Sequence, residues 1–106
     1  MSLFTVILEK AIRELKAPWS PVEIASFTDY IVYLALFEGE YPKGFHSHEY
    51  DELFFVHQGE ITIQIKDGED IVLKEGELGV VPKGVLHCPK SKGKSFVLMF
   101  EPNKAE

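Results

Sequence analysis

The chain has 106 residues, 45% of them hydrophobic and 12% aromatic, which is enough material for one domain with its own apolar core. Eleven Lys and Arg against seventeen Asp and Glu give a formal charge of −6 without a basic run, so neither nucleic acid nor an anionic membrane is an expected partner. The longest apolar stretch, residues 31–37, is too short to span a bilayer. With a single cysteine, Cys88, and no leader-like opening, the chain is expected to be cytoplasmic.

The first segment has a helical pattern. Apolar residues recur at helical spacing between residues 3 and 15, with charged residues between them. This pattern predicts one amphipathic helix over residues 1–17, capped by Ser2 and ended by Pro18. Trp19 lies in the rigid connector that follows, and we expect it to pack the helix onto the rest of the domain.

From residue 22 onward the chain reads as short strands rich in β-branched and aromatic residues, separated by turn signals such as Asp67-Gly68 and Lys83-Gly84. The strands are predicted at residues 22–27, 30–38, 44–49, 52–58, 60–66, 70–74, 78–82, 85–88 and 95–101. Regular short strands without a second helix predict a mainly β fold, an antiparallel jelly-roll barrel over residues 22–102 with one N-terminal helix. The whole chain, 1–106, is expected to form a single domain.

Four side chains are predicted to bind a metal: His46, His48, Glu52 and His87. Side chains alternate along an extended strand, so His46 and His48 face the same side, and Glu52 lies an even number of residues further on. His87 follows a Pro-x-Gly turn that can direct it across a barrel. Three neutral imidazoles and one carboxylate suit one divalent transition metal, namely Mn, Fe, Ni, Cu or Zn.

These residues belong to two longer patterns, His46-x-His48-x3-Glu52-x6-Gly59 and Gly76-x5-Pro82-x-Gly84-x2-His87. Together the patterns resemble the two signature motifs of the cupin superfamily, and the gap between them, residues 60–75, is similar to that of its small single-domain members. The resemblance implies the jelly-roll barrel, the four metal ligands and a homodimer. Two features depart from the motifs: the glycine before the first histidine is displaced, and Ser91 stands where asparagine is frequent.

Residues near the predicted ligands have alternative roles. His57 and Asp51 have the opposite parity from the acidic ligand, so we expect them outside the site, at the surface or in a turn. Cys88 follows a ligand and should face the other way as a buried apolar residue. Phe54 and Val56 share the parity of the acidic ligand and form either the floor of a pocket or ordinary core.

Three functional classes fit this pattern. Four protein ligands leave one or two positions open on a metal that prefers five or six, so a substrate oxygen, water or dioxygen can bind there. The first class is a metal-dependent enzyme acting on a small polar or oxygenated substrate in the barrel mouth. For this class the resemblance implies a dioxygenase-like oxidoreductase, a decarboxylase or a sugar or acid isomerase. The alternatives are a non-catalytic module that binds a sugar or carboxylate and, last, a structural role. The sequence identifies no catalytic acid or base.

Overall fold

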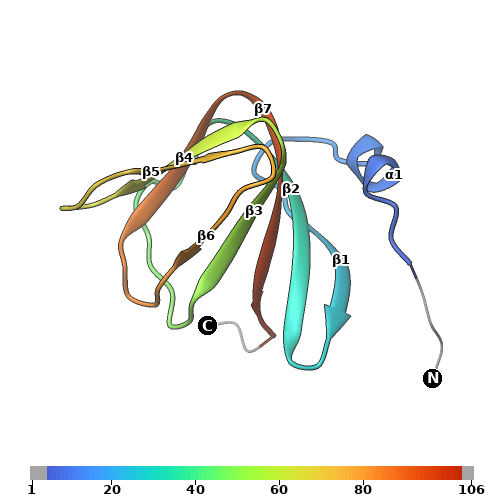
Figure 1. Cartoon of the computed structure of the whole chain (residues 1–106), viewed down its shortest axis with the longest axis horizontal. Helices are drawn as coiled ribbons and strands as arrows, with labels where there is room; N and C mark the ends of the chain where they lie inside the picture. The colour runs from blue at the N-terminus through green and yellow to red at the C-terminus, as the bar shows by residue number, and fades with distance from the viewer. Residues whose placement is uncertain (1–4, 104–106) are drawn as a thin grey trace.

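Seven strands pair antiparallel throughout the part of the chain that the structure, a computed structural model, describes, residues 5–103. They are β1 (Val22–Phe27), β2 (Tyr30–Glu40), β3 (Glu52–Gln58), β4 (Glu60–Ile65), β5 (Ile71–Lys74), β6 (Leu78–Val81) and β7 (His87–Pro102). The strand order β1-β2-β7-β3-β6, with β4 pairing both β5 and β7, folds the sheet over itself into the predicted jelly-roll barrel (Figure 1).

Strand β7 connects the layers of the barrel. Its first residues, 87–90, pair with β4, its later residues, 96–100, pair with β3, and both parts also pair with β2. The two predicted strands at 85–88 and 95–101 are therefore parts of one strand. Ser91 lies between them, where its hydroxyl donates to the Gly93 carbonyl at 2.7 Å and contacts the Ser95 hydroxyl at 2.7 Å. A serine thus makes the turn contacts at the position where the motif often has asparagine.

The barrel core follows from the alternation of side chains along the strands. In β3, Glu52, Phe54 and Val56 are buried, whereas the residues between them are only partly buried. This confirms that these three side chains share the inner face. The buried apolar core contains Ala35, Phe37, Phe54, Val56, Ile61, Ile63, Leu73, Val81, Val97 and Met99.

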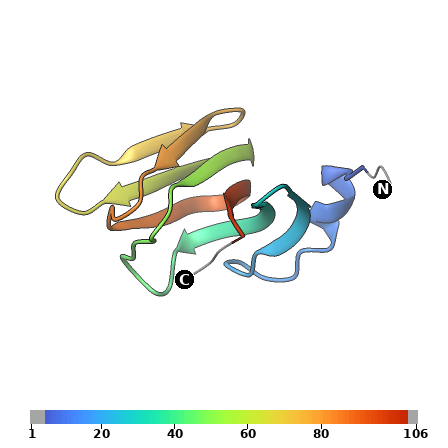
Figure 2. The ribbon, with the colours of Figure 1, turned by 90° about the horizontal axis from the view of Figure 1, so that it is seen from below.

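The N-terminal helix is present but shorter than predicted. Helix α1 spans Leu8–Arg13, and none of its residues is buried. The predicted cap, Ser2, lies outside the described residues, and within them no side chain caps the helix at Ile7. Helix α1 and the β4–β5 hairpin lie at opposite ends of the molecule (Figures 1 and 2). Within residues 5–103, no helix has the length and apolar character needed to cross a membrane.

Trp19 packs against the barrel core from the connector that follows the helix. Its indole stacks on Phe37, with ring centroids 4.4 Å apart, and its Nε1 donates to the Glu38 carbonyl at 2.9 Å. A further hydrogen bond joins its backbone N–H to the Leu36 carbonyl at 2.9 Å. These contacts attach the connector to the last part of β2, because both carbonyls are at the end of that strand.

The predicted strand at 44–49 is wrong. Between β2 and β3 the chain forms a turn-rich segment that pairs with the rest of the protein through one isolated bridge, from His46 to His87. The predicted limits of β1 and β3 match the structure, and β2 continues two residues beyond its predicted end.

Candidate metal centre

His46 and His87 lie directly opposite each other. The His46 N–H donates to the His87 carbonyl at 3.0 Å, and the His87 N–H donates to the His46 carbonyl at 2.9 Å. In an antiparallel pair that exchanges both hydrogen bonds, the two side chains project to the same face. The imidazole centroids are accordingly 4.4 Å apart, although the residues are far apart in the sequence.

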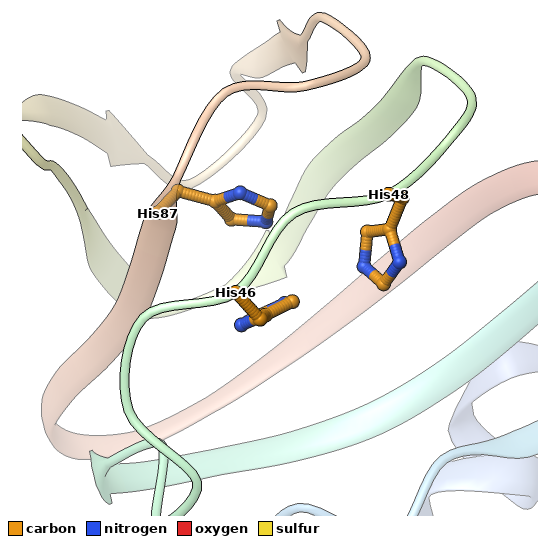
Figure 3. A group of neighbouring side chains, drawn as sticks. All are labelled: His46, His48 and His87. Atoms are coloured by element: carbon orange, nitrogen blue, oxygen red, sulfur yellow. The ribbon is translucent and has the colours of Figure 1, made fainter.

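His48 completes the group from the same segment. Its carbonyl accepts a hydrogen bond from the Gly84 N–H at 2.9 Å, and its ring stacks on Tyr50 with centroids 4.9 Å apart. Gly84 has a φ of +82°, a conformation that glycine adopts without strain, so this glycine suits the turn that leads to His87. Figure 3 shows the three imidazoles arranged around a common space. One nitrogen from each ring lies within 4.8 Å of the others.

Backbone carbonyls orient two of the rings. His46 Nδ1 is 3.2 Å from the Gly44 oxygen, and His87 Nδ1 is 2.8 Å from the Val85 oxygen. A carbonyl oxygen only accepts, so each Nδ1 carries the proton and each Nε2 keeps its lone pair. Such bonds fix the tautomer of metal-binding histidines. The sequence prediction did not include these partners. Each carbonyl lies two residues before its histidine, and the sequence signal for them is that one belongs to Gly44 and the other directly follows the Pro82-x-Gly84 turn.

The buried Nε2 of His87 needs a partner. His87 is 1% exposed, and no atom of residues 5–103 forms a hydrogen bond with this nitrogen. A buried polar atom without a partner is costly, and a metal ion would satisfy the lone pair. Donors bonded to one ion at about 2.1 Å lie roughly 3–4 Å apart. The three nitrogens therefore fit one ion after a small inward movement, and the residues present suit a divalent transition metal.

Glu52 lies beside the histidines. Its side-chain Oε1 is 3.6 Å from His48 Nε2 and 3.7 Å from His87 Nε2, and the residue is 6% exposed. Burial raises the pKa of Glu52, but the neighbouring His87, Glu101 and His48 side chains outweigh burial and hold the pKa below its ordinary value. The carboxylate form, which a metal requires, is therefore favoured.

His46 is also held in the form that binds metal. Burial lowers its pKa, and the charges of His87 and His48 lower it further, against the opposing effects of the Gly44 carbonyl and Glu52. The neutral imidazole is the form that donates its lone pair to a cation.

A cavity of about 410 Å³ opens onto the site. This volume is in the range typical of small-molecule pockets. The lining combines the site residues with aromatic and apolar side chains and two further charged groups: Trp19, Pro21, Tyr33, Phe37, Tyr41, Pro42, Lys43, His46, His48, Glu52, Phe54, Pro89, Met99 and Glu101. Phe54 thus belongs to both the core and the pocket, whereas Val56 belongs to the core alone.

The residues predicted to lie outside the site do so. His57 Nε2 is 3.2 Å from Glu9 Oε1 of helix α1, away from the three histidines. Cys88 is buried, and its thiol contacts the Tyr41 carbonyl at 3.9 Å. Asp51 accepts a hydrogen bond from the Lys83 N–H at 2.9 Å, which ties the turn before His87 to the segment before β3.

Comparison with known proteins identifies the family. The sequence matches the family described as "Cupin domain" over residues 33–100, more than half of the chain. The chain belongs to the cupin family. The match contains the three histidines and Glu52, so the resemblance of the two motifs is confirmed.

Three proteins illustrate the relationship. The uncharacterized protein YdbB of Bacillus subtilis (strain 168) is 38% identical over 94 residues, which cover 89% of this cupin and 82% of YdbB. The crystal structure of a cupin-2 domain containing protein from Shewanella frigidimarina NCIMB 400 has a TM-score of 0.86 and 35% identity, over 92% and 93% of the two chains. The 3-hydroxyanthranilate 3,4-dioxygenase of Xenopus tropicalis is 30% identical over 67 residues, 60% of this chain and only 24% of that enzyme.

The metal-free cupin should lose stability as the pH falls. His46 and Glu52 have lowered pKa values in the folded state, so the unfolded chain binds more protons and the free energy of unfolding rises with pH. For His46 the loss begins as the pH falls through the unfolded value of about 6.5, and for Glu52 it begins below about 4.5. Urea unfolding at about pH 7.5 and pH 5.5 measures the first loss.

His46→Gln should reduce this pH dependence, because glutamine does not titrate. The matched control, His57→Gln, removes a histidine outside the site and should retain it. A free energy of unfolding that stays constant or rises on acidification would contradict the assignment.

Proposed function

We propose that this cupin is a metal-dependent oxidoreductase of the dioxygenase type, with His46, His48, His87 and Glu52 as the ligands of one divalent transition metal. The observation that carries the proposal is the buried His87 Nε2, which has no hydrogen-bond partner among residues 5–103 and lies 3.7 Å from the Glu52 carboxylate. An unpaired lone pair beside two other imidazoles and an acid is the arrangement that a cation stabilises.

The four side chains would contribute different donor groups to the ion. The three imidazoles would supply neutral nitrogen donors, and the hydrogen bonds from Nδ1 to backbone carbonyls orient two of them toward the centre. Glu52 supplies one negative charge, and its burial excludes water from that side. When bound, a redox-active divalent metal would supply Lewis acidity toward an oxygen-containing ligand and electron exchange with dioxygen.

The cavity gives a small substrate access to the open side of the site. His46, His48 and Glu52 line it, whereas the fully buried His87 does not. Oxygen-dependent chemistry is further supported by the 30% identity with the 3-hydroxyanthranilate 3,4-dioxygenase, over 67 residues that make up 24% of that longer enzyme. The competing function is a sensor that binds a sugar or carboxylate at the same site without turnover.

We also propose a cytoplasmic homodimer. Among residues 5–103, strand β1 pairs only with β2, which leaves its other edge without a strand partner there, and Val22, Phe27 and the adjoining Tyr30 expose about half of their surface. An open edge with exposed apolar side chains favours association with a second copy. Sedimentation equilibrium should give twice the mass of 12.0 kDa. A single species of monomer mass at working concentrations would contradict the dimer.

Removing one ligand should weaken metal binding. His87→Ala and Glu52→Gln should each lower the affinity for zinc or manganese by roughly 10-fold or more, because each removes a donor from the site. Glutamine keeps the shape of Glu52 and removes its charge, so this variant tests whether the carboxylate is the fourth ligand. Isothermal titration calorimetry measures the affinity, and His57→Ala serves as the control with unchanged binding. Wild-type affinity in His87→Ala would refute the site.

Oxygen uptake distinguishes the enzyme from the sensor. Elemental analysis of the purified protein identifies the metal, and an oxygen electrode then measures consumption with candidate substrates in the presence of Fe, Mn, Ni or Cu. We expect uptake that depends on both metal and substrate and that disappears in His87→Ala. Tight binding of metal and ligand without any oxygen consumption would favour the sensor.

A further inference from the structure

The aromatic side of the cavity includes a residue from outside the barrel. Trp19 lies in the connector between α1 and β1, yet it lines the cavity beside the metal site. One face of its indole is covered by Phe37, with an interplanar angle of 30°, and its edge meets Tyr41 with centroids 5.5 Å apart. The three rings, Trp19, Phe37 and Tyr41, are called the aromatic wall below.

The backbone holds the aromatic wall in place. Trp19 has a φ of +63°, a conformation that bulky side chains rarely adopt, and it is kept there by hydrogen bonds from its backbone N–H and its indole Nε1 to β2. The Tyr41 N–H donates to the Pro89 carbonyl at 3.0 Å, two residues beyond His87. The Trp19 end of the wall is therefore held by β2, and the Tyr41 end is held by β7, the strand that begins at His87.

The wall leads directly to the metal site. The Tyr41 ring is 4.9 Å from the His46 ring, centroid to centroid, and both line the same cavity. Trp19 and Tyr41 are only partly buried, so each keeps surface that a ligand in the cavity can contact. A molecule bound at the open side of the metal would lie against these rings.

The chemistry of the lining selects one class of ligand. Aromatic rings pair favourably in stacked or edge-to-face arrangements with centroids about 4.5–7 Å apart, and the wall offers both a face and edges. A sugar would need hydrogen-bonding groups on most sides, but most of the described lining beyond the site residues is aromatic or apolar, and its polar groups are Lys43, Glu101 and the hydroxyls of Tyr33 and Tyr41. A flat ring that carries a hydroxyl group would stack against the aromatic wall and bind the metal through its oxygen.

We propose that the cavity binds a small monocyclic aromatic alcohol or phenol, with Trp19 and Tyr41 as the residues that select a flat ring. The proposal rests on the proposed function for the metal that receives the ligand oxygen. The wall contributes the preference for an aromatic ring over an aliphatic ring of the same size.

Two pairs of compounds test this preference on the zinc-loaded protein, in which no oxidation occurs. Phenol is compared with cyclohexanol, and benzyl alcohol with cyclohexylmethanol, so that within the second pair the alcohol group is the same and only the ring differs. Calorimetry measures affinity. Trp19 is the only tryptophan of the chain, so quenching of its emission reports a ring bound beside it.

The aromatic member of each pair should bind roughly 2- to 10-fold more tightly and should quench Trp19 emission. Trp19→Leu should weaken binding of the aromatic member by a similar factor and abolish the preference, whereas Trp19→Phe should keep it. Phe27→Leu, which removes an exposed aromatic side chain from β1, is the matched control and should change neither affinity. If Trp19→Leu does not fold, the affinities of the aromatic and aliphatic compounds for the wild type and for Trp19→Phe still test the preference.

Equal affinity for the two members of each pair in the wild type, or an unchanged preference in folded Trp19→Leu, would overturn the proposal. Elemental analysis of the same samples shows whether the ligand class or the metal centre is wrong. Bound zinc without a preference for aromatic rings refutes the ligand class alone, whereas protein that takes up no metal refutes the metal centre.

Discussion

The site depends on the two hydrogen bonds that His46 and His87 exchange through their backbones. This pair forms an isolated β-bridge between the turn-rich segment before β3 and the beginning of β7, and it places two imidazoles on the same face. A shift of one residue in this pairing would turn one of the two rings to the opposite side. The backbone pairing therefore determines on which face the His46 and His87 side chains lie.

The fold supports this bridge on both sides. Strand β7 pairs with β2, β3 and β4, so His87 begins a strand held by most of the barrel. Glu52 begins β3, the neighbour of the later part of β7, and reaches the histidines from the barrel interior. The connector after α1 adds Trp19, which extends the pocket beyond the barrel. The barrel strands thus carry Glu52 and His87, whereas His46 and His48 come from the turn-rich segment before β3.

Much of the fold and of the candidate site was predictable from the sequence. The even spacing of His46 and His48 and the motif around His87 predicted the cluster, because a set of donors leaves a pattern in residue type and position. Other features had no such signal. Trp19 was predicted to pack the helix onto the rest of the domain, but its hydrogen bonds to β2 carbonyls depend on tertiary structure that the sequence pattern does not show. Alternation of side chains predicted a strand at 44–49, but within that range only His46 forms a β-bridge, and its partner is His87.

Anomalous diffraction from crystals grown with zinc tests the central claim most directly. The account predicts one zinc peak, about 2.0–2.1 Å from the Nε2 atoms of His46, His48 and His87 and about 2.0–2.2 Å from a Glu52 oxygen. The His46–His87 backbone bonds should be intact beside it. A metal bound elsewhere, or imidazoles that remain apart with no peak between them at saturating zinc, would contradict the account.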